Sequence, residues 1–363
     1  MVLPQRIRVE VSPPFELHRL RTIMTGDPDN PDEVMGVLNP ACCRDRAGDL
    51  LLFPRVVAAN NYSRIGVARV RFVGDEPVGI ERLGYALEPA DGFERNIRSG
   101  GGVEDPRVVH VAALDRFVMT YTALGPLGPR IALAVSDDAR TWRRLGPVNF
   151  AYAPGDGTDF DLYQNKDALL FPEPVADPHG RPALALLHRP DYAVPWEGGG
   201  QTRVVPAGVV EERPSVWISY LPLDAARRDL SALGQWSDHR LLATPEQPWE
   251  ARKIGGGTPP LLTPLGWLVL YHGVGQPATP GARPPYSAGA LVLDRDDPRR
   301  VLYRSPDPIL EPATAEEREG IVGNVVFPTG IDQRGGGRVD VYYGMADARI
   351  GVARLHLPAT LPD

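Results

Sequence analysis

Polar side chains recur in or beside short Pro-centred segments of this 363-residue sequence. Burying an unpaired carboxylate among aliphatic residues is costly, so we expect these side chains to converge on a water-filled pocket rather than in a sealed core. No His, Cys or acidic residues have convincing metal-ligand spacing, and we expect neither a metal nor an organic cofactor. The candidates are Asn39, Asp105, Glu173 and Asn324 in or beside the Pro-centred segments, and Arg55, His188, Arg189, His272 and Asp347 further along the chain.

The Pro-centred segments belong to a unit that recurs five times. Each segment is followed by an apolar strand-like run, and four units continue into a run in which small and aliphatic residues alternate. Equivalent positions in the third run, from Gly66 to Gly351, lie 66, 85, 72 and 62 residues apart. These steps are too long for a solenoid coil and suit propeller blades that carry loops. The segments are residues 38–41, 104–107, 171–173, 258–260 and 326–328.

The hydrophobic pattern predicts an almost wholly antiparallel, all-β protein. No window sustains a helical period, whereas alternating apolar runs bounded by Gly, Pro and Asp recur throughout. We therefore predict a five-bladed β-propeller, with residues 37–363 as one domain. Residues 1–36 form an N-terminal extension that packs on the propeller, and its segment 7–11 is a candidate strand that closes the ring or packs beneath it. Residues 190–214, 275–285 and 312–320 are predicted loops, and 231–250 holds at most a short helix.

The charge balance argues against several classes of partner. Lys and Arg number 39 and Asp and Glu 46, a formal net charge of −7 that favours neither nucleic acid nor an anionic membrane. We find no apolar run long enough to span a bilayer and no secretory signal. The two cysteines, Cys42 and Cys43, are adjacent, so we expect free thiols and a cytoplasmic protein. The sequence leaves the oligomeric state open, a homo-oligomer included.

Short motifs in a fixed order show a resemblance to a known family. From residue 37 to 357 the chain resembles glycoside hydrolase family 130, the mannoside phosphorylases and related β-mannosidases. The family fold is a five-bladed β-propeller, which agrees with the repeat count. The motifs are Asn-Pro-Ala at 39–41, Tyr-Ser-Arg-Ile-Gly at 62–66, Gly-Val-Glu-Asp-Pro-Arg at 102–107, Leu-Phe-Pro-Glu at 170–173, His-Arg-Pro at 188–190, Arg-Lys-Ile-Gly at 252–255, Tyr-His-Gly-Val at 271–274 and Tyr-Gly-Met-Ala-Asp at 343–347.

The resemblance implies a role for each matching residue. Asp105 would be the general acid, passing its proton through the sugar 3-hydroxyl to the glycosidic oxygen. An inverting hydrolase needs a second carboxylate to activate water, whereas a phosphorylase needs positive charge to hold phosphate. By resemblance, the cations Lys253 and His272 would bind phosphate, with Tyr286 and Lys166 as further contacts, and Asn39, Arg55 and Asp347 would orient the mannosyl ring.

One pair departs from the family pattern. Several of the phosphorylases carry Arg-Asn where this chain has Lys166-Asp167. Lys lacks the bidentate fork of Arg, and Asp adds an acceptor in place of a neutral amide, which leaves room for hydrolysis. Three roles stay open: Glu173 could bind sugar, activate water or bond to Arg189, and His188 and Arg189 could bind a ligand or join neighbouring blades.

The leading hypothesis is therefore inverting phosphorolysis. A β-linked manno-oligosaccharide, or a mannosyl-glucose or mannosyl-N-acetylglucosamine, would react with inorganic phosphate to give α-mannose 1-phosphate and a shortened acceptor. The first alternative is an inverting β-mannosidase that uses the same pocket, with Glu173 or another carboxylate as the base. A lesser alternative is a non-catalytic glycan-binding propeller. The sequence does not distinguish β-1,2 from β-1,4 linkages.

Overall fold

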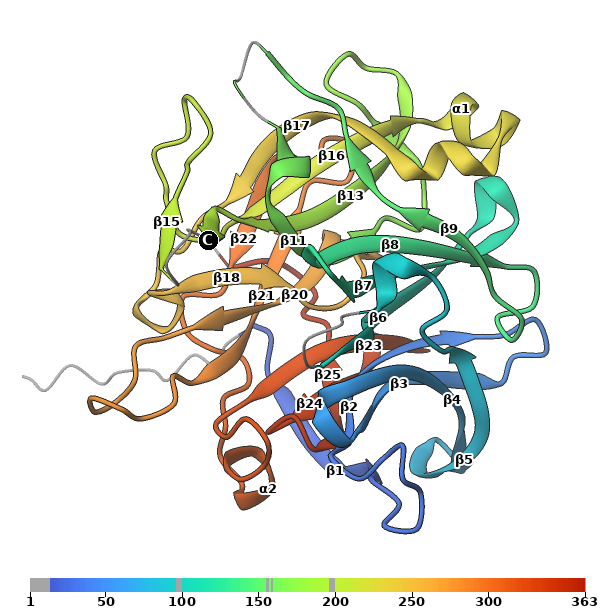
Figure 1. Cartoon of the computed structure of the whole chain (residues 1–363). Helices are drawn as coiled ribbons and strands as arrows, with labels where there is room; N and C mark the ends of the chain where they lie inside the picture. The colour runs from blue at the N-terminus through green and yellow to red at the C-terminus, as the bar shows by residue number, and fades with distance from the viewer. Residues whose placement is uncertain (1–13, 96–99, 155–156, 158, 196–199, 363) are drawn as a thin grey trace, which may run out of the picture.

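The computed structural model describes residues 14–95, 100–154, 157, 159–195 and 200–362. Within them, strands dominate and nearly all strand pairs are antiparallel, so the prediction of an antiparallel, all-β protein is confirmed (Figure 1). The helices are short: α1 (Leu223–Arg228), α2 (Ala315–Arg318) and six 3-10 turns at Ala59–Asn61, Gly92–Glu94, Ala112–Leu114, Phe160–Leu162, Leu230–Gly234 and Pro248–Glu250. No helix in this part of the chain is long and apolar enough to cross a membrane.

The first two repeat units share one sheet of eight strands. Each unit contributes four antiparallel strands, and the units join where β4 and β6 pair in parallel over two residues. The strands of the first unit are β2 (Gly36–Arg44), β3 (Leu50–Ala58), β4 (Tyr62–Val73) and β5 (Glu76–Leu87); those of the second are β6 (Gly101–Val111), β7 (Arg116–Gly125), β8 (Gly128–Ser136) and β9 (Arg143–Pro147).

The third and fourth units form separate sheets, each with four main antiparallel strands. The third unit contains β11 (Gln164–Leu170), β13 (Pro182–Asp191), β16 (Val216–Pro222) and β17 (Gln235–Ala243), with the short β10 (Asn149–Phe150) and β12 (Val175–Ala176) beside them. The fourth contains β18 (Lys253–Gly256), β20 (Gly266–Val274), β21 (Tyr286–Leu293) and β22 (Val301–Arg304), with β19 (Leu261–Thr263). The hairpin of β14 (Ala193–Pro195) and β15 (Gln201–Arg203) lies within the predicted loop 190–214.

The fifth unit takes its last strand from the other end of the chain. Its sheet has the order β1-β25-β24-β23, formed by β23 (Val326–Gly335), β24 (Arg338–Met345), β25 (Arg349–His356) and β1 (Leu17–Thr25). β1 runs antiparallel to β25, from the pair Leu17↔Leu355 to the pair Thr25↔Arg349. In Figure 1 the blue β1 accordingly lies beside the red strands of the C-terminal unit. The candidate strand 7–11 lies outside the described residues, and β1 itself was not predicted.

Two further segments differ from the expectation. Residues 231–250 begin with the end of a 3-10 turn but continue as the strand β17, and residues 312–320 contain α2. β17 was missed because register shifts interrupt its pairing with β16, so its buried residues Trp236, His239 and Ala243 do not alternate regularly. The other predicted loop, 275–285, contains no strand or helix.

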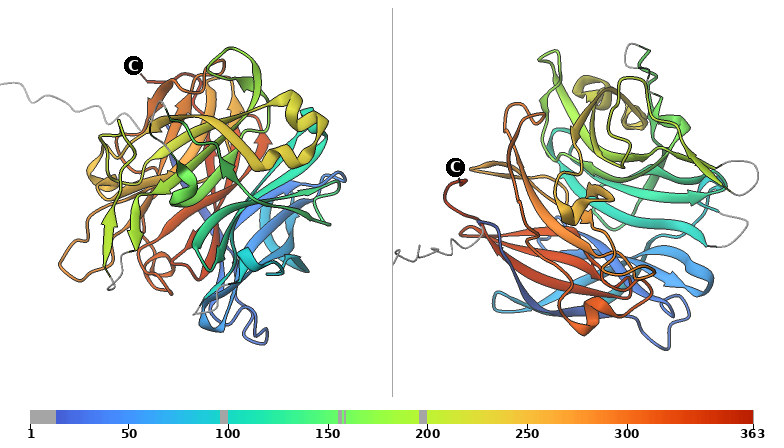
Figure 2. Two further views of the ribbon diagram at one scale, coloured as in Figure 1. Left: turned by 45° about the horizontal axis from the view of Figure 1, so that its top comes forward. Right: turned by 90° about the vertical axis from the view of Figure 1, so that its left-hand side faces the viewer.

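The core consists of five apolar clusters, one between each pair of neighbouring units. Each strand of a unit sends alternate side chains to its two neighbours, because successive residues of a strand point to opposite faces. On β13, for example, Leu186 packs toward the second unit and Leu187 toward the fourth. The fifth cluster joins the first unit to the last, through residues such as Leu52 and Tyr342. Figure 2 shows the sheets from two further sides.

A recurring ion pair ties each of four units together. An acidic residue just before the first strand binds an Arg from the fourth strand, at 2.6 Å for Glu33–Arg82 and 2.8 Å for Glu94–Arg144. The other two pairs are Glu250–Arg304 at 2.6 Å and Glu317–Arg19 at 2.8 Å. Because Arg19 lies on β1, that strand occupies in the fifth unit the place of the fourth strand elsewhere.

Candidate functional site

The first strands of three units carry an irregularity at the same point. β2, β6 and β11 each have a register shift where an Asn or Asp has a positive φ, of 43° at Asn39, 46° at Asp105 and 58° at Asp167. Asn and Asp tolerate this backbone region better than other residues with a side chain. Bulges of this kind redirect a side chain and are frequent beside active sites. A fourth such residue, Asp347 with φ 52°, follows the end of β24.

These redirected side chains line one cavity of about 200 Å³. All five units contribute to its wall, and nine residues predicted from the sequence meet there. They are Asn39, Arg55, Asp105, Lys166, Arg189, Lys253, His272, Tyr286 and Asp347, joined by Asp167, Val322, Val325 and Phe327.

At one end of the cavity, Asp105 is held by two donors. Its Oδ1 atom accepts hydrogen bonds from Asn39 Nδ2 at 2.9 Å and from Arg55 Nη1 at 3.3 Å. Arg55 in turn donates to the buried Glu104 at 2.8 Å and to Ser63 at 2.9 Å. We call Asn39, Arg55, Glu104 and Asp105 the acid end.

Arg107 supports the backbone of Asp105 and does not pair with its carboxylate. The buried guanidinium donates from Nη1 to the carbonyl oxygen of Asp105 at 2.8 Å and from Nε to the carbonyl of Gly257. It therefore steadies the left-handed turn of the chain at Asp105, while the Asp105 carboxylate remains directed at the cavity.

Two carboxyl groups that line the cavity, those of Asp105 and Asp347, differ in pKa. Burial alone would raise the pKa of Asp105, but Arg55, Lys166 and Arg107 outweigh it and hold that pKa below its ordinary value. Burial raises the pKa of Asp347 to about 6, against the opposing effect of Arg55, and the negative charges of Asp105 and Glu104 add to the rise. Asp105 is thus ionised in the unliganded protein. To act as a general acid it would have to be protonated when ligands bind.

A second group of residues that line the cavity gathers cations and donors. Lys253 Nζ lies 5.2 Å from the ring centroid of Tyr286, and the rings of Tyr286 and His272 stack with centroids 5.9 Å apart. Arg189 Nε lies 2.6 Å from Asp167 Oδ2, and His272 Nε2 lies 3.8 Å from the same oxygen. We call Asp167, Arg189, Lys253, His272 and Tyr286 the anion end.

Protonation at the anion end corrects one expectation. Burial, with repulsion from Arg189 and Lys253, lowers the pKa of His272 to about 3, so this imidazole is neutral and not the cation predicted from the sequence. Burial and Arg189 also lower the pKa of Lys253, to about 8, which leaves the ammonium largely protonated at pH 7. The lasting positive charge comes from Lys253 and Arg189, and His272 Nδ1 is buried with no partner among the described residues.

Glycine at position 255 leaves room for this arrangement. A Cβ atom there would collide with Asp167 Oδ2, His272 Cε1 and Arg189 Nε at once. Gly255 thus lets β18 pack closely against side chains of β11, β13 and β20, and the Gly-rich run is followed by a strand and not by the helix of a phosphate-binding loop.

Glu173 and His188 do not reach this cavity. Glu173 lines a different cavity with Pro174, Trp267 and Arg295, so it can neither contact the same ligand nor bond to Arg189. His188 points to the opposite face of β13 from Arg189 and is buried. For His188 the structure therefore corrects the substrate-binding prediction in favour of a bonding role within the fold.

The ring nitrogens of His188 belong to a buried chain of hydrogen bonds. His239 Nε2 lies 2.9 Å from the carbonyl of Ala151, so His239 Nδ1 accepts from Ser219 Oγ at 2.8 Å. Ser219 then accepts from His188 Nε2 at 2.8 Å, and Asn165 bonds the remaining nitrogen. The backbone carbonyl of Asn324, the remaining candidate, accepts a hydrogen bond from Tyr286 N at 2.9 Å.

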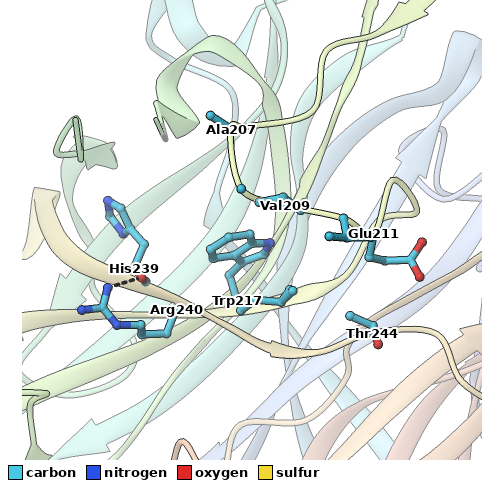
Figure 3. A pocket seen from close by; sticks show the side chains of 10 residues that line it. Ala207, Val209, Glu211, Trp217, His239, Arg240 and Thr244 are labelled. Carbon is cyan, nitrogen blue, oxygen red and sulfur yellow. Dashed lines mark hydrogen bonds between the residues drawn. The ribbon is translucent and has the colours of Figure 1, made fainter. Parts of the chain in front are cut away.

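A larger cavity, of about 640 Å³, lies in the third unit and is lined by apolar residues and by Glu211, Trp217 and His239 (Figure 3). Three of its polar side chains already have partners: Glu211 pairs with Arg213, Trp217 donates to Tyr192, and both His239 nitrogens are bonded. We assign no ligand to it. Among the described residues, no group of three His, Cys, Asp or Glu is placed to hold a metal ion.

Three polar residues of the site were not singled out as site residues. Asp167 was recognised only as a departure from the family pattern, and Glu104 and Arg107 only as parts of a motif. Their signal in the sequence is position: each stands within two residues of a predicted site residue, on a first strand. The bulges that turn them inward leave no clear sequence pattern.

Comparison with known proteins identifies the family. A family model described as beta-1,4-mannooligosaccharide phosphorylase matches residues 8–177 and 235–360. The chain belongs to glycoside hydrolase family 130. It is 32% identical, over 77% of its own length and 79% of the relative's, to a 1,2-beta-oligomannan phosphorylase of Thermoanaerobacter sp. (strain X514). It is 29% identical, over 74% of this chain and 66% of the relative, to a Beta-1,4-mannooligosaccharide phosphorylase of Ruminococcus albus.

Solved structures of family 130 share the fold. The Beta-1,2-Mannobiose phosphorylase from Listeria innocua, in complex with beta-1,2-mannobiose, superposes with a TM-score of 0.68 at 24% identity, covering 94% of this chain and 97% of that one. A second structure, from work on family 130 glycoside hydrolases that target beta-1,2 mannosidic linkages in Candida mannan, gives a TM-score of 0.65 at 20% identity, covering 97% and 95%. These likenesses concern the fold alone.

Proposed function

We propose that this family 130 protein is an inverting β-mannoside phosphorylase that converts a β-linked manno-oligosaccharide and inorganic phosphate into α-mannose 1-phosphate and a shortened acceptor. The observation that carries the proposal is that the acid end and the anion end line the same cavity, so that a proton donor and a site for the attacking anion share one space. The relatives named as phosphorylases of β-1,2- and β-1,4-mannosides support it.

The geometry supports the following course. The mannosyl ring lies between the two ends, oriented by Asn39, Arg55 and Asp347. A phosphate oxygen attacks the anomeric carbon, the bond to the glycosidic oxygen breaks, and that oxygen receives a proton from Asp105 through the sugar 3-hydroxyl. Binding of an anionic phosphate and exclusion of water both raise the pKa of Asp105, which lets it carry this proton.

We also propose that the five antiparallel units are the blades of a five-bladed propeller, with the cavity at their common centre. The closed sequence of apolar clusters, including the one between the last unit and the first, supports this arrangement. The first strands β2, β6, β11, β18 and β23 would then surround the axis.

The second candidate function is hydrolysis, and one residue favours it. Asp347 accepts no hydrogen bond from the described residues, lines the cavity, and has a pKa raised to about 6, as a base that activates water would require. Asp167 is a poor base, because its pairing with Arg189 holds its pKa well below the usual range despite burial. In the hydrolytic alternative Asp347, and not Glu173, would be the base.

Incubation with β-1,2- and β-1,4-mannobiose, with and without phosphate, separates the candidates. We expect α-mannose 1-phosphate in the phosphorus NMR spectrum and no free-mannose release without phosphate beyond background. Asp105→Asn should lower the turnover number by about 10²- to 10⁴-fold, the usual contribution of a general acid, with phosphate affinity retained. Mannose release that is independent of phosphate would instead establish the hydrolase, and absence of any cleavage by the wild type would favour a binding protein.

A further inference from the structure

Asp167 places a carboxylate inside the anion end. It is buried, its Oδ2 atom lies 2.6 Å from Arg189 Nε and 3.8 Å from His272 Nε2, and it lines the cavity with Lys253. A negative charge in a site weakens anion binding unless the anion can make a favourable contact with that charge. The presence of the Asp167 carboxylate among these cations therefore requires an explanation.

The two oxygens of Asp167 have different surroundings. Oδ2 accepts a hydrogen bond from Arg189 Nε. No described residue accepts a hydrogen bond from the two terminal nitrogens of that guanidinium. Oδ1 accepts no hydrogen bond from any described residue. The pair thus presents both a donor fork and a vacant acceptor at the cavity wall, the combination that a partly protonated oxyanion matches.

The charge state of Asp167 makes it an acceptor only. Burial opposes its ionisation, but Arg189 and Arg107 hold the pKa of the carboxyl well below its usual range. An ionised carboxylate has no hydrogen to donate, so it can attract an oxyanion only where that anion supplies one. The neighbouring His272 is neutral and does not cancel the Asp167 charge.

We propose that Oδ1 of Asp167 accepts a hydrogen bond from the acidic hydrogen of the incoming phosphate, so that the site takes oxyanions with a P–OH or As–OH group and rejects sulfate. Near neutral pH sulfate carries no hydrogen, and its oxygens would face the carboxylate with like charge. Asp167 is then a specificity-determining residue for the co-substrate. This inference rests on the proposed phosphorolytic function.

Calorimetric titration of the full chain with inorganic phosphate, arsenate and sulfate at pH 7 tests the inference. The wild type should bind arsenate much as it binds phosphate and sulfate about 10- to 100-fold more weakly, the size of one hydrogen bond to a charged group. In Asp167→Asn the amide can donate to sulfate, and the ratio of sulfate to phosphate affinity should approach one. Asp347→Asn, the same change elsewhere in the cavity, should keep the wild-type ratio.

The outcomes separate the two proposals. Equal affinity of the wild type for sulfate and phosphate would overturn the role of Asp167 without any variant, and so would an unchanged ratio in Asp167→Asn, while phosphorolysis would stand. A wild type that neither binds phosphate nor cleaves with it would overturn the proposed function, and the inference with it.

Discussion

Three aspartates in one cavity differ in pKa because their neighbours differ. Burial raises the pKa of all three, but cations reverse the effect at Asp105 and Asp167 and fail to do so at Asp347. At Asp347 burial is the largest influence, and the negative charges of Asp105 and Glu104, both paired with Arg55, offset the lowering effect of that guanidinium. Residue identity alone therefore sets neither the charge nor the role of these side chains.

Lys253 should limit phosphate binding at alkaline pH. Its pKa is lowered to about 8, chiefly by burial, and only the protonated ammonium attracts an anion. The Michaelis constant for phosphate should therefore rise as pH increases through about 8. Lys253→Arg, whose guanidinium stays charged, should remove this alkaline rise even where the arginine fits less well. The check is a pH series of initial rates from pH 6 to 9.5; the same alkaline rise in the arginine variant would exclude Lys253 as its source.

Asp347 should lower stability above about pH 6. Its folded-state pKa of about 6 exceeds the ordinary value of 3.8, so its contribution to stability is present at low pH and lost as pH rises through 6. Asp347→Asn removes that loss. The melting temperature of Asp347→Asn minus that of the wild type should be about 2–4 °C larger at pH 8 than at pH 4, as measured by calorimetry. If this difference in melting temperature stays constant or decreases from pH 4 to pH 8, the prediction is wrong.

At the scale of elements, strand irregularities build the site. Regular strands would keep alternate side chains in the clusters between units, and bulges at Asn39, Asp105 and Asp167 turn polar groups out of that pattern. The regular parts explain what stays in the core: on β13, His188 follows Leu184 and Leu186 to one face, and Arg189 follows Leu187 to the other. Because adjacent residues of a strand face opposite sides, Arg189 reaches the cavity and His188 does not.

Gly255→Ala should damage phosphate binding with little effect on the rest of the fold. The new methyl group would displace Asp167, Arg189 and His272 together. A shift of this kind raises the Michaelis constant for phosphate by about 10- to 100-fold. Gly92→Ala is the matched control, since a Cβ there meets no atom within 4 Å and φ is not positive. Wild-type phosphate kinetics in Gly255→Ala would show that the close packing has no functional role.

At the scale of the whole molecule, the first and last strands of the described chain pair in one sheet. β1 completes the fifth unit, so the first described strand and the last lie side by side (Figure 1). The buried Glu317 binds both Arg19 of β1 and Tyr343 of β24, repeating the contacts that Glu94 and Glu250 make within their own units. Among the described residues no single core holds the protein together; stability depends on five interfaces, two of which combine residues of β1 with residues of β25.

Arg19→Ala should therefore destabilise the protein more than a neighbouring substitution. It leaves the carboxylate of Glu317 buried without its cation, a change that we expect to cost about 1–3 kcal/mol because Arg19 itself is partly exposed. Arg21 is exposed on the same strand and its side chain has no hydrogen-bond or ion-pair partner among the described residues, so Arg21→Ala should cost less than about 0.5 kcal/mol. Urea unfolding of both variants gives the comparison. Equal losses would mean that the ion pair does not hold β1 in place.

Local patterns in the sequence determined the all-β class, the five repeats and six residues of the cavity, because strand alternation and Pro-centred motifs depend on neighbours along the chain. The resemblance to family 130 added Lys166, Lys253 and Tyr286. Tertiary structure alone decided three things: that β1 completes the last unit, that His188 faces the core and Glu173 another cavity, and that His272 is neutral while Asp347 holds its proton unusually well. The reason is physical. The face on which a side chain lies depends on strand register, and its charge depends on burial and on groups from other strands, and both are set only when distant parts of the chain meet.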